Sequence, residues 1–133
     1  MINLLHGDCL ELMKSIPDKS IDLTVTSPPY DSLRTYNGST PFTFDTFTRV
    51  ANELFRITKD GGVCVWVVGD ATVDFNESGS SFKQALYFKD IGFKLLDTMI
   101  WNKGSFTAVG ALRSRYAQVF EYMFILLKGD KPK

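Results

Sequence analysis

Five residues early in the chain, Thr26-Ser27-Pro28-Pro29-Tyr30, combine groups suited to gripping a planar ring that carries an exocyclic amine. They follow the apolar, β-branched run Ile21–Val25, which is typical of a buried parallel strand. Neither proline can donate a backbone hydrogen bond, and each fixes φ at about −65°, so a rigid loop should end this strand. Open α/β sheets bind ligands at such a loop. Here it would present a hydroxyl, main-chain carbonyls and an aromatic face.

The surrounding sequence alternates between strand and helix patterns. Asp8 followed by Glu11 predicts a capping box at the first helix, and Gly61-Gly62 predicts a left-handed end to the second. A mostly parallel α/β sheet with right-handed crossovers follows, with an antiparallel pair at one edge because no helix separates the last two strands. We expect strands over 2–6, 21–25, 63–68, 93–101 and 119–127, and helices over 9–16, 43–58 and 81–91.

Length and composition indicate a single domain over residues 1–133, with 44% hydrophobic residues to form a core. No apolar run reaches the length of about 18 residues typical of a membrane span, and the first residues lack a signal-peptide pattern. We therefore expect a cytoplasmic protein without a membrane partner. His6 is the only histidine, and Cys9 and Cys64 lie off any metal spacing, so we expect no metal site and reduced thiols packed as small hydrophobes.

The net charge and the local charge of the chain favour different interpretations. Fifteen basic residues balance fifteen acidic ones, whereas an independent duplex-binding domain is usually basic on one face. The stretch 102–116 nevertheless contains Lys103, Arg113 and Arg115 and no acid. Such a stretch suits backbone phosphates, and it suits a solvated loop equally well.

Ser27-Pro28-Pro29-Tyr30 after a strand resembles the catalytic loop of the DNA amino-methyltransferases, which reads (Asp/Asn/Ser)-Pro-Pro-(Tyr/Phe/Trp). The four residues alone would fit a simple strand-ending turn or a proline-rich ligand. More of the chain is similar to the branch with beta-type motif order, in which the catalytic loop comes near the N-terminus. The matching segments are residues 6–11, 17–23, 54–62, 92–103 and 120–129.

This resemblance implies a Rossmann-like, AdoMet-dependent methyltransferase fold, present here in part. It also implies S-adenosyl-L-methionine as cofactor and DNA as partner, in a bacterial or phage restriction-modification setting. By resemblance, Ser27 Oγ and the Pro28 carbonyl accept the amine hydrogens of a flipped base, Pro29 stiffens the loop and Tyr30 stacks on the base. The serine form of the loop favours the 4-amino group of cytosine over the 6-amino group of adenine.

Other residues are weaker candidates. The resemblance implies a cofactor contact for Asp8, although helix capping alone would explain that residue, and Asp70 follows a strand in a similar way. Asp31, Lys103, Arg113 and Arg115 are candidate contacts to the base or the DNA backbone. Trp101 could border the base pocket or belong to the core, and Thr26 could hold the loop backbone.

One expected segment is missing from the sequence. Relatives carry a glycine-rich cofactor loop, Asp-Pro-Phe-x-Gly-x-Gly, and no segment here matches it. We therefore expect a catalytic-loop portion that needs a C-terminal part, a complementary half or a homodimer for activity. The main alternative is a non-catalytic half-domain or assembly module, because missing strands would leave a sheet edge that recruits another chain. A methyltransferase acting on small amines or protein glutamine is a third reading, disfavoured by Ser27 and its flanking segments.

Overall fold

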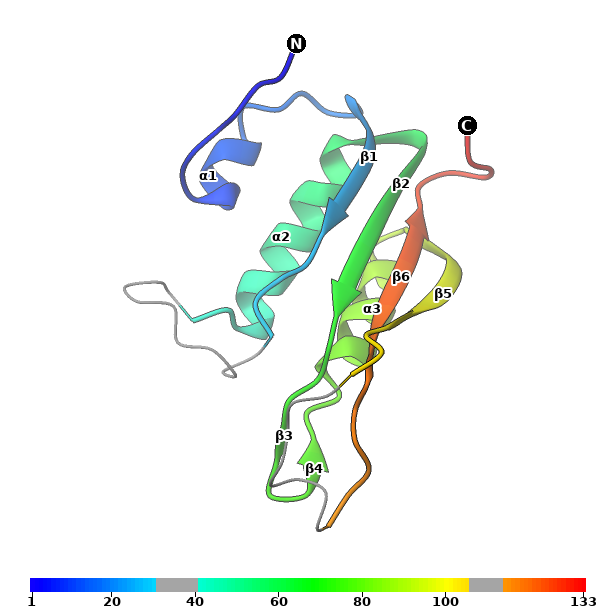
Figure 1. Ribbon diagram of the computed structural model, residues 1–133. Coiled ribbons are helices and arrows are strands. Elements are labelled where there is room, and N and C mark those ends of the chain that lie inside the picture. The colour runs from blue at the N-terminus through cyan, green and yellow to red at the C-terminus, as the bar shows by residue number, and fades with distance from the viewer. Residues whose placement is uncertain (31–40, 106–113) are drawn as a thin grey trace.

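The structure is a computed structural model that describes residues 1–30, 41–105 and 114–133. Its centre is a four-stranded sheet in the order β1-β2-β6-β5 (Figure 1). The strands are β1 (Ile21–Thr26), β2 (Thr58–Val68), β5 (Lys94–Asn102) and β6 (Phe120–Leu127). β1 and β2 pair in parallel, and β6 runs antiparallel to both β2 and β5. The predicted antiparallel pair of final strands is thereby confirmed, with β5 at one edge and β1 at the other.

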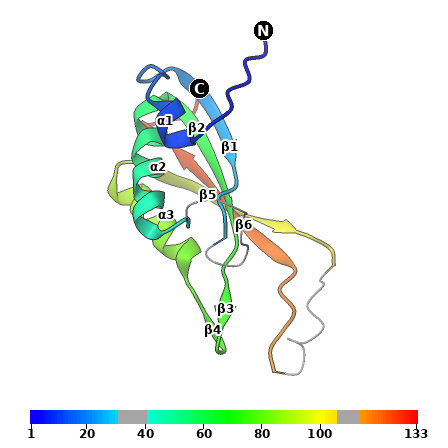
Figure 2. The same ribbon diagram turned by 90° about the vertical axis from the view of Figure 1, so that its left-hand side faces the viewer.

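Helices α1 (Cys9–Met13), α2 (Phe44–Ile57) and α3 (Ser80–Asp90) lie together on one face of this sheet (Figure 2). The core lies between them and the sheet, around Phe47, Trp66 and Phe88, which are almost completely buried. Their rings meet edge to face with centroids 5.2–5.7 Å apart, a favoured geometry for aromatic pairs. β2 therefore faces the helices with its even-numbered side chains, including Cys64 and Trp66.

The first residues differ from the prediction. The strand expected over 2–6 is absent, and these residues are exposed and irregular. A strand needs a neighbour to satisfy its backbone groups, and among the described residues this segment has none. Asp8 does cap α1, accepting a hydrogen bond from the Leu10 N–H at 2.8 Å. Glu11 does not complete the capping box, because its carboxylate is paired with Lys14 at 2.7 Å.

The junction between α2 and β2 also differs. The helix ends without a glycine cap, because Thr58 is already extended (φ −71°, ψ 132°) and starts β2. Gly61 does have positive φ (+86°), but it lies inside β2, where its N–H donates to the Lys128 carbonyl at 2.7 Å. Pairing of Thr58 with Ile21 of β1 explains why the strand starts so early. The small hairpin of β3 (Thr72–Val73) and β4 (Asn76–Glu77) was not predicted.

The second face of the sheet is bare in the described part of the chain (Figure 2). The strand register aligns apolar side chains across it, for example Val25 beside Val65 and Val65 beside Ile125. Val25 is 65% exposed, and Met99 of β5 is 53% exposed. β1 pairs with β2 alone, so the described residues leave its other edge without a neighbouring strand.

Candidate active site

The predicted loop follows β1 and lies beside the carboxyl end of β2. Because the two strands are parallel, Ser27 and Asp70 come from the same end of the sheet. Pro28 is buried, whereas Ser27 is exposed and Tyr30 half-buried. The loop is thus anchored through its prolines and presents its hydroxyl outward, as the sequence predicted.

A chain of hydrogen bonds runs from this loop across the sheet. Ser27 Oγ donates to the Tyr30 hydroxyl at 3.2 Å, and that hydroxyl donates to Oε2 of Glu121 on β6. The ammonium group of Lys103 donates to the other carboxylate oxygen, Oε1, at 2.8 Å. The Glu121 residue is 7% exposed. A buried carboxylate is tolerated only when it is paired, and here two donors satisfy it.

A small polar pocket of about 220 Å³ opens beside these residues. Gly69 lies next to the Tyr30 ring: a Cβ placed on it would be 3.6 Å from Tyr30 Cε2. The pocket therefore offers an aromatic ring, a carboxylate and an ammonium group within one cavity. Its lining residues are Tyr30, Gly69, Asp70, Lys103, Gln118, Phe120 and Glu121.

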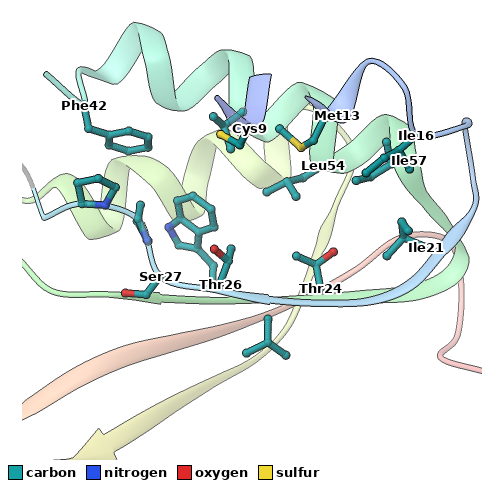
Figure 3. Close-up of a pocket in the computed structure, with 15 residues that line it drawn as sticks. Cys9, Met13, Ile16, Ile21, Thr24, Thr26, Ser27, Phe42, Leu54 and Ile57 are labelled. Carbon is teal, nitrogen blue, oxygen red and sulfur yellow. The ribbon is translucent and has the colours of Figure 1, made fainter. Parts of the chain in front are cut away.

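On the helix side of the loop lies a larger apolar groove of about 480 Å³ (Figure 3). Thr24 and Thr26 of β1 point into it toward the helices, and Ser27 lies at the end of the strand. The groove follows β1, whose outer edge has no neighbouring strand among the described residues. It is lined by Cys9, Met13, Ile16, Ile21, Thr24, Val25, Thr26, Ser27, Pro28, Pro29, Phe42, Val50, Leu54, Ile57 and Trp66.

The two predicted cofactor residues have different surroundings. Asp70 is buried, and its carboxylate accepts from the N–H of Ser81 at 2.9 Å, from the Ser78 hydroxyl at 3.0 Å and from the Ser81 hydroxyl. It therefore joins the end of β2 to the first turn of α3. Asp8 is exposed at the start of α1, directly before Cys9, which lines the groove.

Cys9 corrects an expectation, because it is exposed rather than packed in the core. No strand over 2–6 covers it. Partial burial and the neighbouring Asp8 carboxylate both raise the pKa of its thiol. Cys64 is buried as predicted, and burial raises its pKa to about 12.

The other predicted contacts are only partly brought together. Lys103 joins the Tyr30–Glu121 cluster, whereas Arg115 and Trp101 are exposed, Trp101 at 50%. Asp31 and Arg113 lie outside the described residues. The sequence reasoning missed Glu121 as a site residue. Its signal was a single acid within the apolar strand Phe120–Leu127.

With this geometry in view, comparison with known proteins identifies the class. The family model "DNA methylase", of the N6 and N4 type, matches residues 21–133, so the chain belongs to this family of methyltransferases. The orphan methyltransferase M.BamHII of Bacillus amyloliquefaciens is 57% identical over 122 residues, which make up 92% of this chain and 43% of that protein. The Type II methyltransferase M.ScaI of Streptomyces caespitosus is 34% identical over 104 residues, 77% of this chain and 34% of that protein.

Solved structures agree on the fold. The PvuII DNA methyltransferase, described as cytosine-N4-specific, superposes with a TM-score of 0.79 at 26% identity, over 96% of this chain and 49% of that one. TTHA0409 of Thermus thermophilus, described as a putative DNA modification methylase and complexed with S-adenosyl-L-methionine, gives 0.74 at 28% identity over 96% and 55%. The fold is thus the AdoMet-dependent DNA methyltransferase fold. The chain spans about half the length, or less, of these four proteins.

In the described residues, no helix is both long and apolar enough to cross a bilayer. Within the same ranges, no three His, Cys, Asp or Glu side chains are grouped so that they could hold a metal ion.

Proposed function

We propose that this chain is the catalytic-loop portion of a DNA methyltransferase that methylates an exocyclic amine of a flipped base. The observation that carries this proposal is the Ser27–Tyr30–Glu121 chain of hydrogen bonds at the carboxyl ends of parallel strands. It joins an oxygen acceptor that lines the apolar groove to an aromatic ring that lines the small polar pocket, in a chain of the DNA methylase family.

The exocyclic amine is a poor nucleophile because its lone pair is delocalised into the ring of the base. Ser27 Oγ and the Pro28 carbonyl would each accept one amine hydrogen, which turns the lone pair out of the ring plane and toward the methyl donor. A serine is too weakly basic at neutral pH to remove the proton first, so its role is positioning, and the proton leaves after methyl transfer. Pro29 keeps the loop rigid while this geometry forms.

The polar pocket is the proposed place for the extruded base. Stacking on the Tyr30 ring is worth about 1–3 kcal/mol, which is comparable to the few kcal/mol that extrusion costs. Lys103 lies in the pocket wall and would donate to a ring nitrogen or carbonyl of the base. Arg113 and Arg115, together with Asp31, are proposed to contact DNA next to the base.

We favour the 4-amino group of cytosine over the 6-amino group of adenine. Ser27 stands where adenine enzymes more often have aspartate, and one structural neighbour at 26% identity is a cytosine-N4-specific enzyme. A Type II modification role, as in the relative M.ScaI, is part of the same proposal.

S-adenosyl-L-methionine would supply the electrophilic methyl group. The chain fits this cofactor in part: the exposed Asp8 carboxylate beside the apolar groove suits its polar groups. Asp70, whose carboxylate already accepts three hydrogen bonds, is better placed to hold the pocket wall than to bind cofactor directly. No glycine-rich loop is present in the sequence, so the rest of the cofactor site would come from another segment.

We propose that residues 1–133 form one methyltransferase catalytic domain only when completed by such a segment, from a complementary half or a second copy. Three features support this: the unpaired edge of β1, the apolar groove along it and the bare apolar face of the sheet. We call this part the completing segment, and the chain joined to it the assembled enzyme. The same features support a second candidate function, a non-catalytic assembly module.

Calorimetric titration of S-adenosyl-L-methionine into the chain, alone and with a completing segment, tests the proposal. Methylated nucleosides released from the DNA would then be identified by mass spectrometry. Cofactor binding followed by N4-methylcytosine in DNA supports the enzyme. Stable assembly with neither cofactor binding nor methylated DNA would favour the assembly module.

A further inference from the structure

We propose that Glu121 is a positioning residue that acts through Tyr30 to make Ser27 a better hydrogen-bond acceptor. This inference rests on the proposed function, because it assigns Ser27 to the amine. It concerns β6, a strand far from the catalytic loop in sequence, and a residue whose role no sequence motif defined.

The direction of the hydrogen bonds carries the first step. Ser27 Oγ donates its hydrogen to Tyr30, and Tyr30 donates its own to Glu121. With its hydrogen committed in this direction, the Ser27 oxygen turns its lone pairs toward the open side of the loop. An oxygen in that state can accept from an amine, whereas a freely rotating hydroxyl would spend part of its time donating.

The carboxylate fixes that direction. A carboxylate can only accept, so the Tyr30 hydroxyl must donate to it, and the Tyr30 oxygen is left to accept from Ser27. Chains of hydrogen bonds polarise one another in surroundings of low dielectric constant, and Glu121 is buried. Each bond in the chain therefore strengthens the acceptor character of Ser27.

Lys103 holds the carboxylate in place. Its ammonium binds Oε1 at 2.8 Å while Tyr30 binds Oε2, so the two donors hold opposite oxygens. The position of the Tyr30 ring is set at the same time, because its hydroxyl is tied to β6 and its ring lies against Gly69 of the β2 end. The loop is thereby fastened to two strands of the sheet.

The test uses two variants and two readouts. Tyr30→Phe keeps the ring and the Lys103–Glu121 ion pair but breaks the chain; Glu121→Gln replaces the carboxylate by an amide whose N–H2 can donate to Tyr30. The controls are Tyr122→Phe, on the neighbouring residue of β6, and Glu53→Gln, on α2. The first readout is the ¹³Cζ resonance of Tyr30 in the ring-labelled 133-residue chain. The second is the split between kcat and the KM for DNA in the assembled enzyme.

We expect Glu121→Gln to shift the Tyr30 resonance toward that of the exposed Tyr116, with no shift from Glu53→Gln. Both site variants should lower kcat about tenfold, the effect of one lost hydrogen bond, with an unchanged KM for DNA because the stacking ring remains. Tyr122→Phe should leave both constants unchanged.

An unchanged Tyr30 resonance in Glu121→Gln would overturn the proposal, since the hydrogen bond between Tyr30 and Glu121 would then not exist. A shifted resonance with an unaltered kcat would overturn it too, because the contact would be merely structural. If the wild-type assembled enzyme does not methylate DNA, the proposed function fails and the positioning role fails with it. A shifted Tyr30 resonance would then show only that Tyr30 and Glu121 are hydrogen-bonded. The failure of the proposed function can thus be distinguished from the failure of the positioning role.

Discussion

The hydroxyl of Tyr30 donates a hydrogen bond to the carboxylate of Glu121, a residue 91 positions further along the chain. This contact joins the loop after β1 to β6, with the end of β2 between them. It explains how a loop with an exposed Ser27 can hold a defined geometry. The proposed positioning of the amine by Ser27 depends on that geometry.

Ser27→Ala should abolish turnover in the assembled enzyme, a loss of at least about a hundredfold, because the acceptor for one amine hydrogen is gone. The fold should not change, since Ser27 is exposed. Steady-state methyl transfer to DNA and the thermal unfolding midpoint measure the two effects. Ser15→Ala, which removes an exposed hydroxyl from the turn after α1, is the matched control. Turnover retained in Ser27→Ala would refute the assignment.

Gln84→Leu should destabilise the chain by about 1–3 kcal/mol. Gln84 of α3 accepts a hydrogen bond from the buried indole N–H of Trp66 at 2.8 Å, and leucine leaves that donor buried without its acceptor. Urea unfolding, followed by circular dichroism, gives the free energy of unfolding. Lys83→Ala on the exposed side of the same helix should change it by less than about 0.5 kcal/mol. Equal stability of Gln84→Leu and the wild type would contradict this account of the core.

A fall in pH should weaken the contacts that hold α2 against the turn after α1. Hydrogen bonds from Arg56 hold the pKa of Glu53 below its usual range, and Arg56 also binds the carbonyls of Met13 and Ile16. The unfolded chain then binds the proton more readily. This stabilisation is present above the ordinary glutamate pKa of about 4.3 and is lost as the pH falls through the lower folded pKa.

The size of this effect should be less than about 1 kcal/mol, because the pair is partly exposed. Unfolding free energies of the wild type and Glu53→Gln, measured between about pH 6 and pH 3 across the glutamate range, should converge at the acid end. Glu11→Gln, which breaks the exposed pair with Lys14, is the control. A constant difference between wild type and Glu53→Gln at all pH values would argue against the pairing.

Thiol labelling should distinguish the two cysteines. Cys9 is exposed and Cys64 is buried with its pKa raised to about 12, so a disulfide reagent should modify one thiol in the folded chain and both in denaturant. The thiolate is the reactive form of a cysteine. Because the pKa of the Cys9 thiol is raised, its reaction should continue to accelerate as the pH rises above the ordinary thiol pKa. Cys9→Ser should remove the fast phase.

The same reagent reports on the apolar groove, since Cys9 lines it. A completing segment that docks along β1 should slow the labelling of Cys9. Unchanged labelling in a complex of proven stoichiometry would place the partner elsewhere.

Elements set by residues close together in sequence could be predicted, whereas elements set by distant contacts could not. β1, its proline loop and α2 are set by residues close together in sequence, and they were predicted within one or two positions. The strand expected over 2–6 fails because a strand requires a partner, which its own residues cannot reveal. Gly61 was predicted to end a helix, but pairing of Thr58 with Ile21 extends β2 instead.

The site divides in the same way. Ser27 and Tyr30 were predicted from a contiguous motif, and Lys103 from charge. Glu121 was missed because its importance comes from two partners, Tyr30 and Lys103, that lie 91 and 18 positions away. A single acid in an apolar strand was visible in the sequence, but only the register of β6 shows that it faces the loop.

The most direct test of the central claim is a graft. The segment of M.BamHII that matches this chain, 43% of that protein, would be replaced by the chain, as wild type and as Ser27→Ala. Methyl transfer to DNA would be measured and the modified base identified. We predict that the wild-type graft forms N4-methylcytosine and that the Ser27→Ala graft, equally folded, forms none. A folded wild-type graft that binds the cofactor but methylates nothing, or equal activity of the two grafts, would contradict the account.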